Sequence, residues 1–148
     1  MRSNRSIPPV TVRPVLAYPD VRAAVAWLGD AFGFVEHVRI GESHRAQLGI
    51  GEDGAVIVAE ADGEHQPPQP GVVPQHLKVR VEDVQAAFER ACSGGAHVLT
   101  PPTDRPYGER ECTVEDLAGH RWQLTETIAD VAPEEYGCTT VEPWPDRA

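Results

Sequence analysis

Three predicted strands bring together the side chains in this sequence that could bind a ligand. Side chains alternate across a strand, so His76 and Lys78 lie on the face opposite their apolar neighbours. The same alternation puts Arg13 and Gln123 on the face of their strands that helices leave open. Cationic and amide donors that converge in a low-dielectric cleft favour an anionic or oxygen-rich ligand, whereas charges on a wet sheet face contribute little. The sequence is compatible with both situations.

A second candidate is the loop Tyr107-Gly108-Glu109-Arg110, which lies just ahead of a predicted strand. An aromatic ring, a flexible glycine and two charges could cover a cleft, and Tyr107 and Glu109 are then expected to contact the ligand. A turn with a local ion pair explains the same residues equally well.

A sequence repeat supplies the elements that must position these residues. The run Asp20-Val21-Arg22-Ala23-Ala24-Val25 returns 63 residues later as Asp83-Val84-Gln85-Ala86-Ala87-Phe88. In each copy an aspartate that can cap a helix opens a run of helical apolar spacing, and the run ends at glycine. Short β-prone runs separated by turn residues follow each helix. The predicted strands are 10–18, 34–40, 43–50, 55–60, 76–81, 98–100, 109–114 and 120–125.

The element order is therefore βαβββ followed by βαβββ, which predicts an α+β fold. We expect the tandem modules to form a curved mixed sheet around a cleft, with the helices on the outer face. The chain is predicted to be one domain, 1–148, with a loose arm at 1–9. The halves are predicted at about 10–60 and 75–127, with a proline-rich linker at 61–74 and an acidic C-terminal tail at 128–148.

Composition narrows the classes of partner. The formal net charge of −10 disfavours nucleic acid and anionic membranes, because both would be repelled by an acidic surface. No apolar run approaches the ~20 residues that span a bilayer. Three widely spaced cysteines are typical of a reduced compartment, so we expect a cytoplasmic protein with a small-molecule partner.

The run Asp116-Leu117-Ala118-Gly119-His120-Arg121-Trp122-Gln123-Leu124, together with the duplicated order and the helix openings, resembles the glyoxalase, bleomycin-resistance and extradiol-dioxygenase superfamily, whose fold is called vicinal oxygen chelate. The segment from Pro101-Pro102 to Tyr107-Gly108-Glu109-Arg110 is similar to the PhnB-like subgroup. The resemblance covers roughly residues 10–129. It implies a small-molecule ligand and a homodimer.

In the metalloenzymes of that family a divalent ion, such as Zn, Ni, Mn or Fe, binds in the cleft to one ligand from each of four strands. At the position of the first-strand ligand this sequence has Arg13, whose guanidinium cannot bind a cation. The resemblance therefore implies a degenerate metal site and no resident metal. His44 or Glu109 could supply missing ligands where two subunits share a cleft. The positions implied are Arg13, Val58 with Glu60 one pleat further on the same face, His76 and Gln123; the metal-ligating types among them are His76, Glu60 and Gln123.

Three functions follow from this resemblance. The first is a binding protein of the bleomycin-resistance kind, which sequesters an antibiotic or a metabolite without metal chemistry. The second is a metal-dependent isomerase, lyase or dioxygenase that uses His76 and Glu60. The third is a non-catalytic dimeric module with a vestigial pocket. Catalytic residues are not identified by the sequence.

Overall fold

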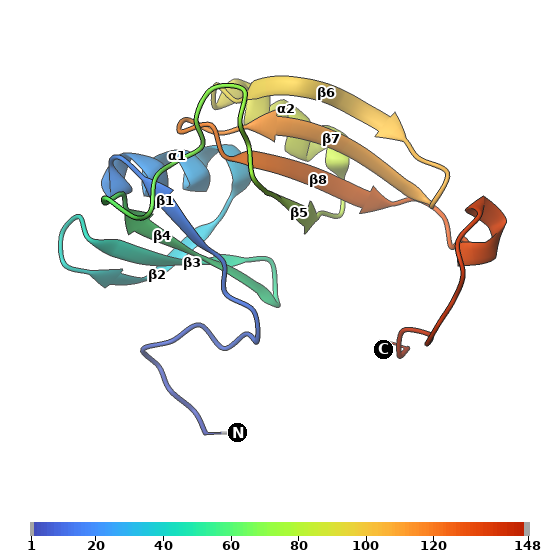
Figure 1. Ribbon diagram of the computed structural model, residues 1–148, viewed down its shortest axis with the longest axis horizontal. Helices are drawn as coiled ribbons and strands as arrows, with labels where there is room; N and C mark the ends of the chain where they lie inside the picture. The colour runs from blue at the N-terminus through green and yellow to red at the C-terminus, as the bar shows by residue number, and fades with distance from the viewer. Residues whose placement is uncertain (1, 147–148) are drawn as a thin grey trace.

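Each half of the chain forms one helix and one four-stranded sheet, as seen in a computed structural model that describes residues 2–146 (Figure 1). The first sheet has the strand order β1-β4-β3-β2 and the second has the order β5-β8-β7-β6. In both sheets the first strand of the half pairs parallel with the last, and the remaining pairs are antiparallel. The predicted tandem βαβββ order is confirmed.

The elements of the first half are β1 (Val15–Tyr18), α1 (Val21–Phe32), β2 (Val35–Ile40), β3 (Arg45–Ile50) and β4 (Gly54–Glu60). Those of the second half are β5 (His76–Arg80), α2 (Val84–Ser93), β6 (His97–Asp104), β7 (Glu109–Glu115) and β8 (Arg121–Thr127). A 3-10 turn, η1 (Pro133–Tyr136), follows in the tail. Residues 147 and 148 of the predicted tail lie outside the described residues, as does Met1 of the predicted arm.

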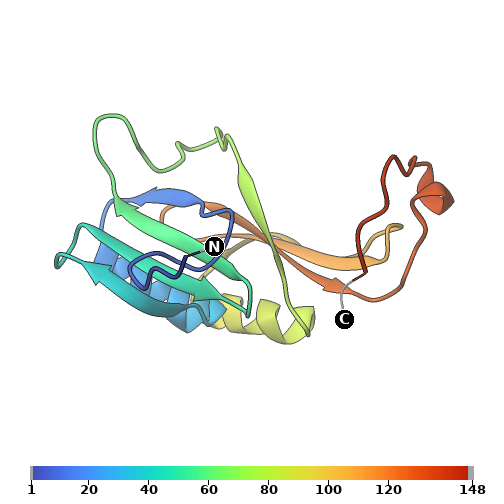
Figure 2. The same ribbon diagram turned by 90° about the horizontal axis from the view of Figure 1, so that it is seen from below.

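Both helices begin where the repeat predicts. Asp20 accepts a hydrogen bond of 3.0 Å from the Ala23 amide, and Asp83 accepts one of the same length from the Ala86 amide. These carboxylates satisfy amides that the first helical turn leaves without partners. The helices lie side by side on one side of the molecule and the sheets lie on the other (Figure 2). Among the described residues, no helix is long and apolar enough to span a membrane.

The main core forms between α1 and the first sheet. Leu16 and Tyr18 of β1 are buried there, as their alternation predicts, and Trp122 and Val114 of the second half complete the same cluster. Val58 of β4 is also fully buried in this core. Its side chain therefore faces the helix side, and its predicted place in an open cleft is wrong.

Two other expectations about the N-terminal part of the chain need correction. Strand β1 begins only at Val15, so Arg13 precedes it, is exposed, and donates from Nε to the Val10 carbonyl at 3.1 Å. The arm is not loose: Pro8 is buried, and Gln47 of β3 donates from Nε2 to the Ser6 carbonyl at 2.9 Å. The arm thus crosses the open face of the first sheet (Figure 2).

Strand β6 is longer than expected because it continues through Pro101 and Pro102. Proline cannot donate a ladder hydrogen bond, but β6 is the edge strand of its sheet, where one side needs no donor. The pairing with β7 shifts register between Thr100 and Thr103. The prolines are thus accommodated by a bulged edge.

Candidate functional site

The open face of the second sheet carries most of the predicted site residues. His76 and Lys78 extend from this face of β5, because Leu77 and Val79 pack toward the helices. Gln123 of β8 lies beside Lys78 in the parallel register. The structure thus places His76, Lys78 and Gln123 on one face, as the alternation predicts, and leaves Arg13 outside the strands.

A buried carboxylate lies at the centre of this face. Glu111 of β7 is 2% exposed, and Lys78 Nζ donates to its Oε2 at 2.9 Å. The Tyr107 hydroxyl donates to Oε1, and Arg105 Nε lies 3.5 Å from the same oxygen. Lys78 Nζ also lies 5.4 Å from the centre of the Tyr107 ring. A buried charge is costly unless it is paired and hydrogen-bonded, and here two cations and a hydroxyl supply that compensation. We call these four residues the Glu111 cluster.

The pKa values of Glu111 and Tyr107 are displaced in opposite directions from their ordinary values. Burial alone would raise the pKa of the Glu111 carboxyl, but the hydrogen bonds from Tyr107 and Lys78, together with the charges of Lys78 and Arg105, hold the pKa below its ordinary value. Burial, followed by the hydrogen bond to Glu111, raises the pKa of Tyr107 to about 12. The carboxyl therefore stays ionised and the phenol stays protonated.

Sequence reasoning missed Glu111 although a signal for it was present. Along β7 the polar residues Glu109, Glu111 and Thr113 alternate with Arg110, Cys112 and Val114, and Cys112 and Val114 are buried in the core. The predicted residue Glu109 lies on the same open face, and its Oε2 is buried without a hydrogen-bond partner among the described residues. The alternation used for β5 and β8 would have found both glutamates.

The loop around Tyr107 contains the predicted local ion pair, and its predicted role as a cover over the cleft stays a prediction, since Tyr107 does not line the groove. Arg110 Nε donates to Asp104 Oδ1 at 2.6 Å, which is the local ion pair. The ring of Tyr107 lies instead at the open face, where Tyr136 of the tail lies 5.9 Å away, centre to centre. Gly108 has a φ of 85°, a left-handed conformation that favours glycine.

A groove of about 800 Å³ lies between the two halves. Its walls come from Val12 and Pro14, the turn between β3 and β4, and strand β5. Lys78 is the one predicted site residue among its lining residues; Arg13, Tyr107 and Gln123 are not part of it. The expected basic inner face is only partly present, since carboxylates also line the groove. Its charged residues are Lys78, Arg80, Glu52, Asp53, Glu82 and Glu126.

The predicted metal ligands do not converge within one chain. Glu60 ends β4 in register with Tyr18, on the helix-side face of the first sheet, and His44 Nδ1 lies 3.8 Å from it. His76 and Gln123 belong to the second sheet, and Gln123 Nε2 donates to Thr113 Oγ1 at 3.2 Å. Within residues 2–146, no three His, Cys, Asp or Glu side chains are grouped to hold a metal ion. The residues of one chain therefore do not fit a resident divalent ion.

A buried network fixes the two halves relative to each other. Tyr18 of β1 donates from its hydroxyl to Asp116 Oδ2 at 2.5 Å, and Trp122 Nε1 donates to the same oxygen at 3.0 Å. His120 Nε2 donates to the Ala17 carbonyl at 2.6 Å. Burial, reinforced by the Asp116 charge, raises the pKa of Tyr18 far above its ordinary value, so the phenol remains a donor.

Comparisons with known proteins agree with this architecture. A family model described as Glyoxalase/Bleomycin resistance protein/Dioxygenase superfamily matches residues 9–124. The uncharacterised protein Rv0887c of Mycobacterium tuberculosis is 31% identical over an alignment of 133 residues that covers 82% of this chain and 77% of that protein.

Solved structures give the same result. TioX from Micromonospora sp. ML1 is 33% identical with a TM-score of 0.65, covering 78% of this chain and 97% of that chain. A glyoxalase/bleomycin resistance protein/dioxygenase from Nocardioides is 18% identical with a TM-score of 0.65, covering 84% and 87%, which shows the shared fold. The PhnB-like subgroup stays a prediction. The chain belongs to the glyoxalase/bleomycin resistance protein/dioxygenase superfamily.

Proposed function

We propose that this protein binds a small organic molecule, an antibiotic or a metabolite, in the groove between its two halves, without catalysing a reaction. The groove itself is the observation that carries the proposal. Its volume of about 800 Å³ lies within the range of about 300–1,000 Å³ that is typical of ligand sites. Apolar side chains such as Val12 and Leu77 line it together with charged groups, which would orient a ligand.

The charged lining favours a ligand with both donors and acceptors. Arg80 forms no ion pair within the described part of the chain and is available to a ligand oxygen. Glu52 and Glu82 line the same groove and would accept from a ligand amine or hydroxyl. The buried, unpartnered Oε2 of Glu109, on the neighbouring open face, offers a further acceptor. A purely anionic ligand would be repelled by these carboxylates, so an oxygen-rich or zwitterionic molecule suits the groove better.

The Glu111 cluster is better suited to binding a ligand than to acting as a general acid or base. A general acid or base works best when its pKa lies near the working pH. The pKa values of Glu111 and Tyr107 are displaced in opposite directions, away from neutrality. The cluster therefore supplies a fixed platform beside the groove.

The proposal includes a homodimer in the cytoplasm. Strand β2 is an edge of the first sheet, and its Val35 and Ile40 are 54% and 39% exposed. On the opposite edge strand, β1, Val15 is 47% exposed. A second copy that covers one of these edges would bury apolar surface and protect unpaired backbone groups. Cys92, Cys112 and Cys138 are free thiols, which is typical of a reducing compartment.

Two measurements on the full chain test the proposal. Elemental analysis of protein purified without chelators comes first; stoichiometric Zn, Ni, Mn or Fe that is lost in His76→Ala would overturn the metal-free binding protein and favour the metal-dependent enzyme. A thermal-shift screen of aromatic antibiotics and oxygenated metabolites, followed by calorimetry, then identifies a ligand. We expect Arg80→Ala to weaken binding about tenfold, because a hydrogen bond to a charged group is lost. Arg2→Ala, at an exposed position of the arm, is the matched control. Absence of any ligand would favour the non-catalytic module.

A further inference from the structure

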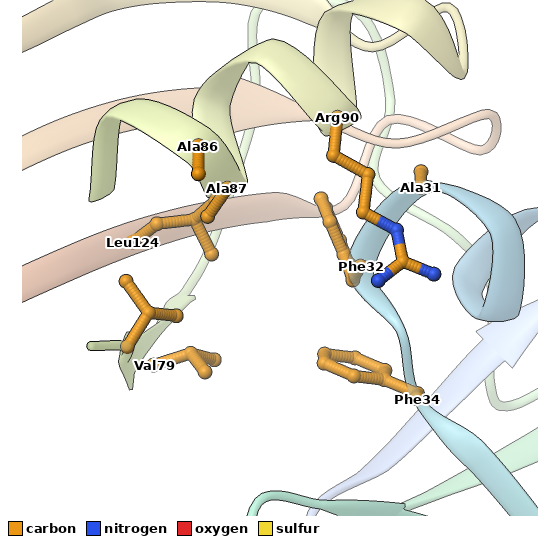
Figure 3. A pocket seen from close by; sticks show the side chains of 9 residues that line it. Ala31, Phe32, Phe34, Val79, Ala86, Ala87, Arg90 and Leu124 are labelled. Carbon is orange, nitrogen blue, oxygen red and sulfur yellow. The ribbon is translucent and has the colours of Figure 1, made fainter. Parts of the chain in front are cut away.

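A second pocket lies on the helix side of the molecule, between α2, strand β5 and the end of α1. Its volume is about 210 Å³. Figure 3 shows Val79 and Leu124 on one side of the space, Phe32 and Phe34 on the other, and Ala87 of α2 above it. Strand β5 separates this pocket from the open face, because the side chains of Val79 and Lys78 extend to opposite sides.

The pocket exists because the two copies of the repeated helix are packed differently. Ala24 of α1 is fully buried against its sheet, whereas Ala87, 63 residues later, is only half-buried. The small side chains of Ala86 and Ala87 line the pocket, so the second half retains an apolar hollow beside α2 where Ala24 of α1 is closely packed.

One cation lies at the rim of this hollow. Arg90 Nε donates to the Asp30 carbonyl at 2.9 Å, and its Nη2 donates to the Gly29 carbonyl at 3.2 Å. These two bonds fix the plane of the guanidinium at the end of α1. Arg90 forms no ion pair in the range 2–146, and its Nη1 has no hydrogen-bond partner there. A fixed guanidinium with free N–H groups beside an apolar space can bind a carboxylate at low entropic cost.

We infer that this pocket binds a one-ring aromatic monocarboxylate, with the ring among Phe34, Val79 and Leu124 and the carboxylate on Arg90. An apolar cavity of about 150 Å³ accommodates benzene, so about 210 Å³ accommodates a substituted ring. The pocket adjoins the groove proposed above, since Val79 and Val81 of β5 line both, but Leu124 and Arg90 line the pocket alone and Arg80 lines the groove alone.

Benzoate is the probe, with benzyl alcohol as its neutral counterpart. The methyl NMR signals of Leu124 in the full chain report on the pocket, because Leu124 lines the pocket and not the groove. We expect saturable shifts with benzoate at millimolar concentration and about tenfold weaker binding of benzyl alcohol. Arg90→Gln should reduce benzoate affinity to that of benzyl alcohol, because it removes the charge but retains hydrogen-bonding groups.

Two further variants separate the pocket from the groove. Ala87→Leu should fill the space and abolish the shifts; if it lowers the melting temperature, Ala86→Leu at the exposed rim replaces it, with Ala23→Leu at the equivalent position of α1 as the control. Arg80→Gln, in the groove, should leave benzoate binding unchanged. Unsaturable shifts, binding that survives both blocking variants, or binding lost in Arg80→Gln would each overturn the inference.

Discussion

The Tyr18 hydroxyl donates to the Asp116 carboxylate at 2.5 Å and thereby joins the first strand of one half to the β7–β8 turn of the other. The same carboxylate accepts from the backbone amides of Ala118 and His120, each at 3.0 Å. The buried Asp116 carboxylate thus stabilises the β7–β8 turn and also connects the two halves of the chain. The groove also lies between the two halves, although neither Tyr18 nor Asp116 lines it.

Removing the hydroxyl should therefore destabilise the whole domain. Tyr18→Phe keeps the ring in the core but leaves Asp116 with one donor fewer, which should cost about 1–3 kcal/mol in the free energy of unfolding. Urea denaturation followed by tryptophan fluorescence measures this. Tyr136→Phe, at an exposed tyrosine, is the control and should change stability by less than about 0.5 kcal/mol. Equal midpoints for the two variants would contradict the role given to Tyr18.

The Glu111 cluster makes stability depend on pH. The folded-state pKa of Glu111 is lowered, so its ionised form stabilises the fold above the unfolded-state pKa. That contribution is lost as the pH falls through the folded-state pKa. We expect Glu111→Gln to be clearly less stable than the native chain at pH 7, with the difference shrinking on acidification. Denaturation at a series of pH values checks this, and a difference that grows toward acid pH would refute the assignment.

The ion pairs of Glu36 with Arg22 and Arg39 should make a second contribution to folding stability that is lost at acid pH. Hydrogen bonds from Arg22 and then Arg39 lower the pKa of Glu36 to about 2. Its stabilising effect is complete above the ordinary pKa of 4.5 and is lost as the pH falls toward 2. NMR titration of the Glu36 carboxyl should give a midpoint well below 4, and Arg22→Met should raise it. A midpoint near 4.5 in the native chain would show that the network does not form.

Alanine substitutions at two glycines with positive φ can separate the cost of backbone strain from the cost of a steric clash. A Cβ at Gly108 would lie 2.4 Å from the Ala129 carbonyl oxygen, whereas a Cβ at Gly95 would meet nothing within 4 Å. Gly95→Ala should cost about 1 kcal/mol for the positive φ alone. Gly108→Ala should cost more, because the tail must also move. Thermal denaturation compares them; similar losses would mean that the tail yields without cost.

Alternation along strands predicted the second sheet well. Leu77 and Trp122 are large and apolar, so they determine which side of β5 and β8 faces the helices and, by exclusion, where Lys78 and Gln123 lie. In β4 the same method failed, because Val58 is apolar on a strand whose two faces are both largely covered. A strand without polar alternation gives no information about its faces.

The contacts that complete the site could not be predicted from the spacing of residue types within single strands and helices. The Glu111 cluster depends on the loop that carries Arg105 and Tyr107, and the groove lies between two halves that are joined at Asp116. The contacts join residues far apart in the sequence: Lys78 and Glu111 are separated by 33 positions, and Tyr18 and Asp116 by 98. The capping aspartates Asp20 and Asp83, by contrast, act within one helical turn, and the sequence was sufficient to predict them.

The N-terminal arm is expected to act as a structural cover for the first sheet. Pro8 is buried on it, and the Gln47 amide, itself 6% exposed, uses Ser6 as its acceptor. Deleting residues 2–9 would expose that face and leave Gln47 without this bond, which should cost about 1–3 kcal/mol in unfolding free energy. Hydrogen exchange of the β3 and β4 amides should accelerate, while exchange in β7 and β8 stays close to that of the full chain. Gln47→Ala in the full chain is the matched variant, because it removes the hydrogen bond and keeps the apolar cover. If the deletion and the full chain exchange alike in β3, the arm does not protect this face.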